Sequence, residues 1–253
     1  MSIVNFVGAG PGAADLITLR GKSLLEQAAV VIYAGSLVNP ELLGYTNASC
    51  EIHNSAEMTL DEVIDTIQTA VSDGKSVVRL HTGDPSVYGA IREQMDRLEA
   101  LSIDYAICPG VSSVNAAASA LRAEYTLPSV SQTVILTRAA GKTPVPERES
   151  IRSLAAHGAT MVLFLSSALL ETVSADLIAG GYAPETPAAI VYKASWPVEK
   201  IVRCTLSSLA ESAADNNITK TALICVGEFL GDAYELSRLY APDFSTEYRQ
   251  AKP

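Results

Sequence analysis

Apolar and amphipathic runs alternate along most of the chain. The short apolar runs have the length of buried strands, whereas the longer runs repeat their apolar residues every three or four positions, as one buried helix face requires. The predicted strands cover residues 3–7, 30–33, 77–81, 105–108, 133–137, 160–165, 188–193 and 222–226, and a further short strand lies in "WPVEKIVRCTL". The predicted helices follow Thr18 and Thr59 and cover residues 90–101, 113–121, 151–157, 168–179 and 206–216. This order predicts an α/β protein.

The segment "LRAEYTLPSV", residues 121–130, interrupts the alternation between two α/β halves. We expect a hinge there, with an N-terminal α/β domain at 1–120 and a C-terminal α/β domain with a tail at 121–253. A chain of 253 residues is long enough for two separate cores. From Gly231 onward the tail shows little periodicity.

Composition excludes several classes of function. The net charge of −10 argues against nucleic-acid binding but permits an anionic small molecule in a local basic site. We expect a cytoplasmic protein, because no apolar run of about 18 residues and no secretory signal are visible. Four scattered cysteines predict reduced thiols, and three histidines without ligand spacing predict no metal held by the protein.

The stretch "VGAGPGAADLIT" resembles a dinucleotide-binding fingerprint, because Gly8, Gly10 and Ala13 match G-x-G-x-x-G/A. Two details disfavour NAD. Pro11 removes one backbone N–H from the turn, and the later run "AAVVIYAGSLV" offers no carboxylate for the ribose. An NAD(P)-linked oxidoreductase stays open as an alternative.

Three glycine- and proline-rich turns each follow a predicted strand. We call residues 8–12 the first turn, 82–89 the second turn and 109–113 the third turn. Open α/β sheets bind ligands beyond the carboxyl ends of their strands, so the three turns predict a shared crevice. Asp84 in the second turn fits a turn former as well as a ligand-binding carboxylate.

The ordered motifs "VGAGPGAADLIT", "GDPSVYG", "PGVSS", "TR", "VYKASWP" and "TALICVGE" resemble those of the tetrapyrrole methylases, the class III S-adenosylmethionine (SAM)-dependent methyltransferases. Within that family, "YAGSLVNPELL", "NSAEMTLDEV", "GDPSVYGAIREQ" and "SQTVILTRAAGKTPVPE" are most similar to the precorrin-4 C-11 methyltransferases of cobalamin biosynthesis. The resemblance extends from Ile3 to about Tyr240.

The resemblance implies two α/β domains with a cleft between them, SAM as cofactor with S-adenosylhomocysteine as product, and a homodimer. The cofactor-binding residues that it implies are Pro11, Thr82, Gly83, Asp84, Val87, Ser112, Ser113, Leu165, Ala194, Ala222 and Leu223. Without the resemblance, Leu165 and Ala194 would count as plain core residues.

The implied tetrapyrrole substrate carries many carboxylates, so the site needs cations. Arg138 and Lys142 in "TRAAGKTPVPE" are candidates, and so is Arg92, although a solvated helix face explains Arg92 equally well. Arg122 is a weaker candidate, and we expect both Lys200 and Arg203 to face solvent.

No catalytic residue is identified, because a methyl group can pass directly from SAM to an electron-rich carbon when the two are aligned. Uroporphyrinogen-methylating relatives are thought to use an Asp and a Lys, where this chain has Ala34-Gly35 and about Asn54. This departure argues against uroporphyrinogen as substrate. Another ring methylase of the same pathway and a non-catalytic SAM sensor are the remaining alternatives.

Overall fold

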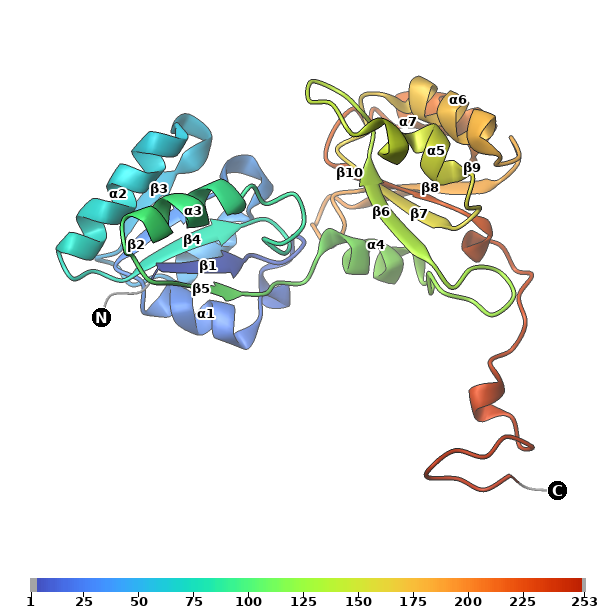
Figure 1. The fold of residues 1–253 in the computed structure, drawn as a ribbon, viewed down its shortest axis with the longest axis horizontal. Coiled ribbons are helices and arrows are strands. Elements are labelled where there is room, and N and C mark those ends of the chain that lie inside the picture. The colour runs from blue at the N-terminus through green and yellow to red at the C-terminus, as the bar shows by residue number, and fades with distance from the viewer. Residues whose placement is uncertain (1–3, 252–253) are drawn as a thin grey trace. The chain divides into compact units, whose positions relative to one another are not determined.

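The computed structural model describes residues 4–251 and contains two five-stranded sheets flanked by helices, as an α/β fold requires (Figure 1). The chain divides into two compact units. The first comprises Met1–Ala117 and Lys193–Glu199, and the second comprises Ala118–Tyr192 and Lys200–Pro253. Ile3, where the first strand was predicted to begin, lies outside the described residues.

The sheet of the first unit is entirely parallel and has the strand order β3-β2-β4-β1-β5. Its strands are β1 (Val4–Gly8), β2 (Val30–Tyr33), β3 (Glu51–Asn54), β4 (Val77–His81) and β5 (Tyr105–Cys108). All five residues of β1 and of β4 are buried, because helices cover both faces of this sheet. Because β1 lies between β4 and β5 in this parallel sheet, the carboxyl ends of the three strands lie side by side.

Helices α1 (Leu19–Glu26), α2 (Leu60–Ser72) and α3 (Arg92–Ala100) belong to this unit. One apolar cluster contains residues of α2 and α3, and a second contains residues of α1, so the two sets lie on opposite faces of the sheet (Figure 1). Helix α2 begins after Thr59, as predicted, and Thr59 and Glu62 form a capping box at its start.

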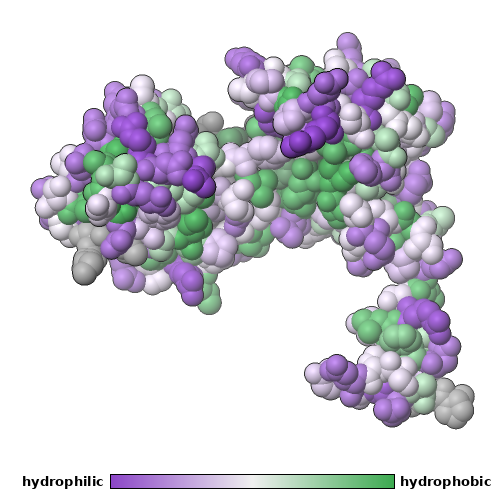
Figure 2. Space-filling model, viewed as in Figure 1, coloured by the Kyte–Doolittle hydropathy of each residue, from purple (hydrophilic) through white to green (hydrophobic). Residues whose placement is uncertain are grey.

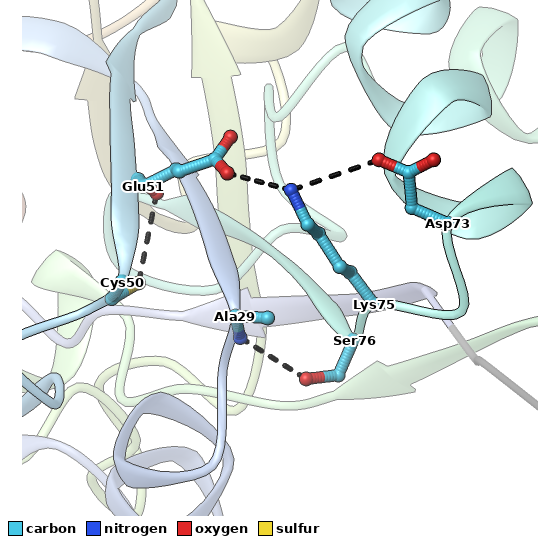
Figure 3. A network of polar contacts seen from close by, with 6 residues as sticks. All are labelled: Ala29, Cys50, Glu51, Asp73, Lys75 and Ser76. Carbon is cyan, nitrogen blue, oxygen red and sulfur yellow. Dashed lines mark hydrogen bonds and ion pairs between the residues drawn. The ribbon is translucent and has the colours of Figure 1, made fainter.

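Strand β3 was not predicted. It is an exposed edge strand of mostly polar residues, so it shows neither an apolar run nor an alternation. Its position depends on contacts from elsewhere in the chain (Figure 3). The Lys75 ammonium lies 2.6 Å from the Glu51 carboxylate and 3.7 Å from that of Asp73. Directly before β2 and β4, Ala29 N donates to Ser76 Oγ at 3.1 Å.

The sheet of the second unit is mixed and has the order β6-β7-β10-β8-β9, in which only β6 and β7 pair in parallel. Its strands are β6 (Val134–Arg138), β7 (Thr160–Phe164), β8 (Pro187–Tyr192), β9 (Lys200–Thr205) and β10 (Ala222–Val226). Helices α5 (Ile151–Ala155), α6 (Leu170–Gly180) and α7 (Leu209–Asp215) share one apolar core with this sheet. The division between the units, after Ala117, falls within helix α4 (Ser113–Leu121).

Edge strand β6 leaves apolar side chains partly uncovered. Leu136 is 42% exposed, and Figure 2 shows a hydrophobic area over this part of the second unit. Beyond β10, the described tail contains 3-10 turns at Glu228–Leu230 and Arg238–Tyr240 but no further strand or α-helix, in keeping with its lack of periodicity.

Candidate functional site

The three turns converge at the carboxyl edge of the first sheet, as predicted. Ala9 N donates to His81 O at 2.7 Å, and Gly10 and Gly83 exchange two backbone hydrogen bonds of 3.2 and 2.9 Å. These bonds join the first turn to the start of the second. The sequence alone placed the turns after strands, and the order of β1, β4 and β5 makes them neighbours.

Glycines are required here by close packing of the backbone. A Cβ on Gly8 would lie 2.5 Å from Gly110 Cα and 2.6 Å from Gly83 O, and a Cβ on Gly110 would lie 2.2 Å from Gly83 O. No side chain fits at such distances. The packing of three strand ends therefore explains Gly8, whereas Gly10 is explained by its φ of +80°, in the left-handed region that favours glycine.

A segment distant in sequence holds the first turn. This 193–199 segment connects β8 to β9 in the second sheet, yet it groups with the first unit. Trp196 Nε1 donates to Pro11 O at 3.1 Å, and Ala13 N donates to Ser195 Oγ at 3.0 Å. The motif "VYKASWP" contains Ser195 and Trp196, but no local pattern of residues indicated this role.

Gly12 is the counterpart of Trp196. A Cβ on Gly12 would lie 2.1 Å from Trp196 Cδ1, so glycine is the residue that leaves room for the indole ring. Asn39 donates to Gly12 O at 2.9 Å, and the ammonium of Lys193 lies 5.1 Å from the centre of the Trp196 ring. The first turn is thus fixed from two sides.

Asp84 joins the second turn to the third. Its carboxylate accepts hydrogen bonds from Gly110 N at 2.8 Å, from Ser86 N at 2.8 Å and from Ser86 Oγ. Burial by itself raises the pKa of Asp84, but these hydrogen bonds outweigh burial and place the pKa below its ordinary value. The turn-forming interpretation therefore explains Asp84 without a ligand.

Two polar side-chain atoms beside the turns are buried without a hydrogen-bond partner among residues 4–251: His81 Nε2 and Thr82 Oγ1. Burial, followed by the charge of Arg79, lowers the pKa of His81 to about 3, so its imidazole is neutral. A buried hydroxyl without a partner is costly, and Thr82 therefore has a hydrogen bond to offer to a bound molecule.

The remaining predicted residues of the first unit lie around these turns. Gly83 has a φ of +61°, the left-handed region that favours glycine, and a Cβ there would lie 3.6 Å from Ser113 N. Val87 and Ser112 are half-buried, whereas Ala194 in the 193–199 segment is buried.

In the second unit, Leu165 stands out. It follows β7 with a φ of +51°, and 68% of its surface is exposed. Continuing the antiparallel register of β7 and β10 by two residues brings Ala222 opposite Leu165. Ser167 Oγ donates to Ala222 O at 3.1 Å, and Leu223 is buried on β10. Residues other than glycine that are held at such positive φ values cluster at functional sites.

Two of the arginines predicted to bind the substrate, Arg138 and Arg92, have partners close by in the chain. Arg138 donates from Nη1 to Ala139 O and Thr143 O, each at 3.2 Å, and from Nη2 to Pro144 O at 2.8 Å, so it holds its own loop. Lys142 in that loop is exposed. Arg92 is 84% exposed and pairs with the Asp96 carboxylate at 2.7 Å, which favours the solvated-face interpretation.

Lys200 and Arg203 are exposed, as expected, but each donates a hydrogen bond to a backbone carbonyl. Lys200 Nζ donates to Asn216 O at 3.2 Å, and Arg203 Nη2 donates to Leu121 O, the last residue of α4, at 2.8 Å.

The two positions at which a departure from uroporphyrinogen-methylating relatives was expected, Ala34-Gly35 and Asn54, are neighbours. Tyr33 pairs with Asn54 across β2 and β3. Gly35 has a φ of +63°, and a Cβ on it would lie 3.5 Å from Asn54 Oδ1 and 2.8 Å from Ala56 Cβ. A small residue is thus required beside Asn54.

Among the residues that the structure describes, no cluster of three or more His, Cys, Asp or Glu side chains could hold a metal ion. Within the same residues, no helix has the length and apolar character needed to span a membrane.

Comparisons with known proteins decide the family. The family model of the tetrapyrrole (corrin/porphyrin) methylases matches residues 4–210. The chain belongs to this family. A tetrapyrrole methylase from Methanocaldococcus jannaschii, named cobalt-precorrin-4 C(11)-methyltransferase, is 55% identical over 98% of this chain and 96% of its own length.

Solved structures of the family agree. A cobalt precorrin-4 methyltransferase has a TM-score of 0.89 at 48% identity, covering 90% of this chain and 96% of its own. A uroporphyrin-III C-methyltransferase from Thermus thermophilus, complexed with S-adenyl homocysteine, has a TM-score of 0.74 at 25% identity, covering 90% of this chain and 93% of its own. The predicted family and fold class are confirmed.

Proposed function

We propose that this tetrapyrrole methylase transfers the methyl group of SAM to carbon 11 of precorrin-4 or of cobalt-precorrin-4. The observation that carries the proposal is the 55% identity to a cobalt-precorrin-4 C(11)-methyltransferase over 98% of the chain. The same reaction was expected from the motifs in the second turn and around Arg138.

The residues present fit SAM. Thr82 has a buried hydroxyl that lacks a partner among the described residues, and Leu165 exposes an apolar side chain at a strand end. We propose that Pro11, Thr82, Gly83, Asp84, Val87, Ser112, Ser113 and Ala194 of the first unit and Leu165, Ala222 and Leu223 of the second unit bind the cofactor.

Within this set, we propose two kinds of contribution. Asp84 shapes the second turn through bonds to Gly110 and Ser86, and Pro11 is held by Trp196. Thr82 supplies a hydrogen bond, while Leu165 supplies apolar contact. When bound, SAM supplies a methyl group that its sulfonium makes electrophilic. The chain orients the ligands and excludes water, which contributes about 7–11 kcal/mol in well-aligned reactions.

The substrate's carboxylates require cations. We propose Arg138 and Lys142, with Arg92 as a third and weaker candidate because of its ion pair with Asp96. The loop after β6 carries Arg138 and Lys142 together, and the hydrogen bonds of Arg138 to Thr143 and Pro144 give that loop a defined conformation. A guanidinium held in this way retains N–H groups for a carboxylate.

The test is a transfer assay with methyl-labelled carbon-13 SAM. We expect one added methyl group, located at carbon 11 by carbon-13 NMR, with precorrin-4 or cobalt-precorrin-4 as substrate and none with uroporphyrinogen III. Parallel assays with both forms of precorrin-4 identify the preferred one. A label on any other carbon refutes the assignment to carbon 11.

The same preparation separates the alternative functions. Calorimetric titration with SAM and with NADH distinguishes a methyltransferase from an oxidoreductase. SAM binding without formation of S-adenosylhomocysteine in the presence of precorrin-4 would identify a sensor. The homodimer and the cytoplasmic location stay predictions, which light scattering and cell fractionation test.

A further inference from the structure

A buried arginine lies in the central strand β4 directly before the second turn. Arg79 is 6% exposed, and no carboxylate of residues 4–251 lies within ion-pair distance of it. Its Nε donates to Gln94 Oε1 and its Nη1 donates to Ile32 O, both at 3.0 Å. Burying a guanidinium without an anion is unfavourable, which points to a role for this residue beyond core packing.

Gln94 extends this contact to Ala90, the residue that directly follows the second turn. The side chain of Gln94 is buried in the first turn of α3, and its Nε2 donates to Ala90 O at 3.0 Å. Because Arg79 can only donate, it fixes the amide oxygen of Gln94 toward itself and leaves the amide N–H groups for Ala90.

The backbone at that point is strained. Tyr88 and Ala90 have φ values of +56° and +49°, which residues other than glycine seldom adopt. Between them, a Cβ on Gly89 would lie 2.2 Å from Pro85 O, so the second turn folds back tightly on itself. Such a conformation persists only where the surrounding contacts hold it.

We infer that Arg79 and Gln94 are positioning residues that hold the second turn in its strained conformation and thereby set the affinity for SAM. The inference rests on the proposed function, because the second turn carries Thr82, Gly83 and Val87. Asp84 fixes the start of this turn through Gly110, and the Arg79–Gln94 pair fixes its end at Ala90.

The variant Gln94→Glu separates positioning from packing. Glutamate keeps an oxygen acceptor for Arg79 but has no N–H for Ala90 O. We expect a folded protein whose dissociation constant for SAM, measured by calorimetry, rises about 10-fold, the equivalent of one lost hydrogen bond. In the transfer assay KM for SAM should rise by a similar factor, while kcat at saturating SAM stays within about two-fold.

Leu98→Ala is the matched control, because Leu98 is fully buried on the same helix, in an apolar cluster that includes no residue of the second turn. We expect a lower melting temperature and an unchanged SAM dissociation constant. Gln94→Met, which keeps the side-chain length but neither polar group, serves as the second variant if Gln94→Glu does not fold, and we expect the same weakening of SAM binding.

Three results contradict the inference. Wild-type affinity in folded Gln94→Glu or Gln94→Met shows that the turn holds without Gln94. An equal loss of affinity in Leu98→Ala shows that general loosening of α3 is responsible. Failure of the wild-type protein to bind SAM instead refutes the proposed function, and with it the inference, so the two failures are distinguishable.

Discussion

Replacement of Gly12 by alanine tests the fit between the first turn and Trp196. The added methyl carbon would lie 2.1 Å from Trp196 Cδ1 and 2.3 Å from Trp196 Nε1, distances at which the indole ring must move. Moving the ring breaks the 3.1 Å hydrogen bond from Trp196 Nε1 to Pro11 O, and it displaces Ser195 from its bond with Ala13 N.

The expected cost follows from these contacts. Each lost hydrogen bond is worth about 0.5–1.5 kcal/mol, and overpacking in a close-packed region costs about 1–3 kcal/mol. Because movement of the ring relieves part of the overpacking, we expect Gly12→Ala to lower the free energy of unfolding by about 2–3 kcal/mol. For a chain of this size, that loss lowers the melting temperature by roughly 4–12 °C.

The assay is a double-mutant cycle with Trp196→Ala, followed by urea unfolding and far-ultraviolet circular dichroism. Far-ultraviolet dichroism is needed because Trp196 is the single tryptophan of the chain, so its removal abolishes tryptophan fluorescence. In the Trp196→Ala background Ser195 Oγ, 2.9 Å away, still lies close to the added methyl group. A serine hydroxyl can rotate away, so we expect Gly12→Ala to cost less than about 1 kcal/mol there. Gly44→Ala is the control, because a Cβ on Gly44 meets no atom within 4 Å.

The reasoning is refuted if Gly12→Ala destabilises the protein equally in both backgrounds, since the cost would then lie outside the contact with Trp196. It is also refuted if Gly44→Ala costs as much as Gly12→Ala, since the loss would then reflect the removal of a glycine in general.

Three further predictions concern individual side chains. Thr82→Val removes a buried hydroxyl that has no partner within the described part of the chain, so it should leave the free energy of unfolding unchanged or raise it while weakening SAM binding about 10-fold; unchanged affinity by calorimetry would remove Thr82 from the cofactor site. The pKa of His81 is lowered from 6.5 to about 3, so below pH 6.5 the unfolded chain binds a proton that the folded protein does not. The free energy of unfolding should therefore decrease as the pH is lowered from 6.5 toward 3, by up to about 1.4 kcal/mol per pH unit. In urea unfolding, His81→Phe should show a shallower dependence on pH if His81 is responsible. Arg138→Ala should weaken tetrapyrrole binding much more than SAM binding, and less so at high salt; equal losses for both ligands in binding titrations would indicate a folding defect.

Much of the fold could be predicted from local patterns. Strands β2, β4, β5 and β10 and helix α4 occur with the predicted bounds, because a buried strand or an amphipathic helix has an apolar pattern of its own. β3 could not be predicted, since its polar residues are held by pairing with β2 and by Lys75.

The candidate site likewise has features that the sequence predicts and features that it does not. The sequence by itself determined that three glycine-rich turns follow strands, because glycine and proline report local backbone geometry. Only the tertiary structure decided that Trp196 packs on Gly12 and that Gln94 joins Arg79 to Ala90. Trp196 and Gly12 lie far apart in the chain, and arginine and glutamine side chains are usually exposed. Contacts between distant residues depend on the order of strands and on burial, which no local pattern of residues encodes.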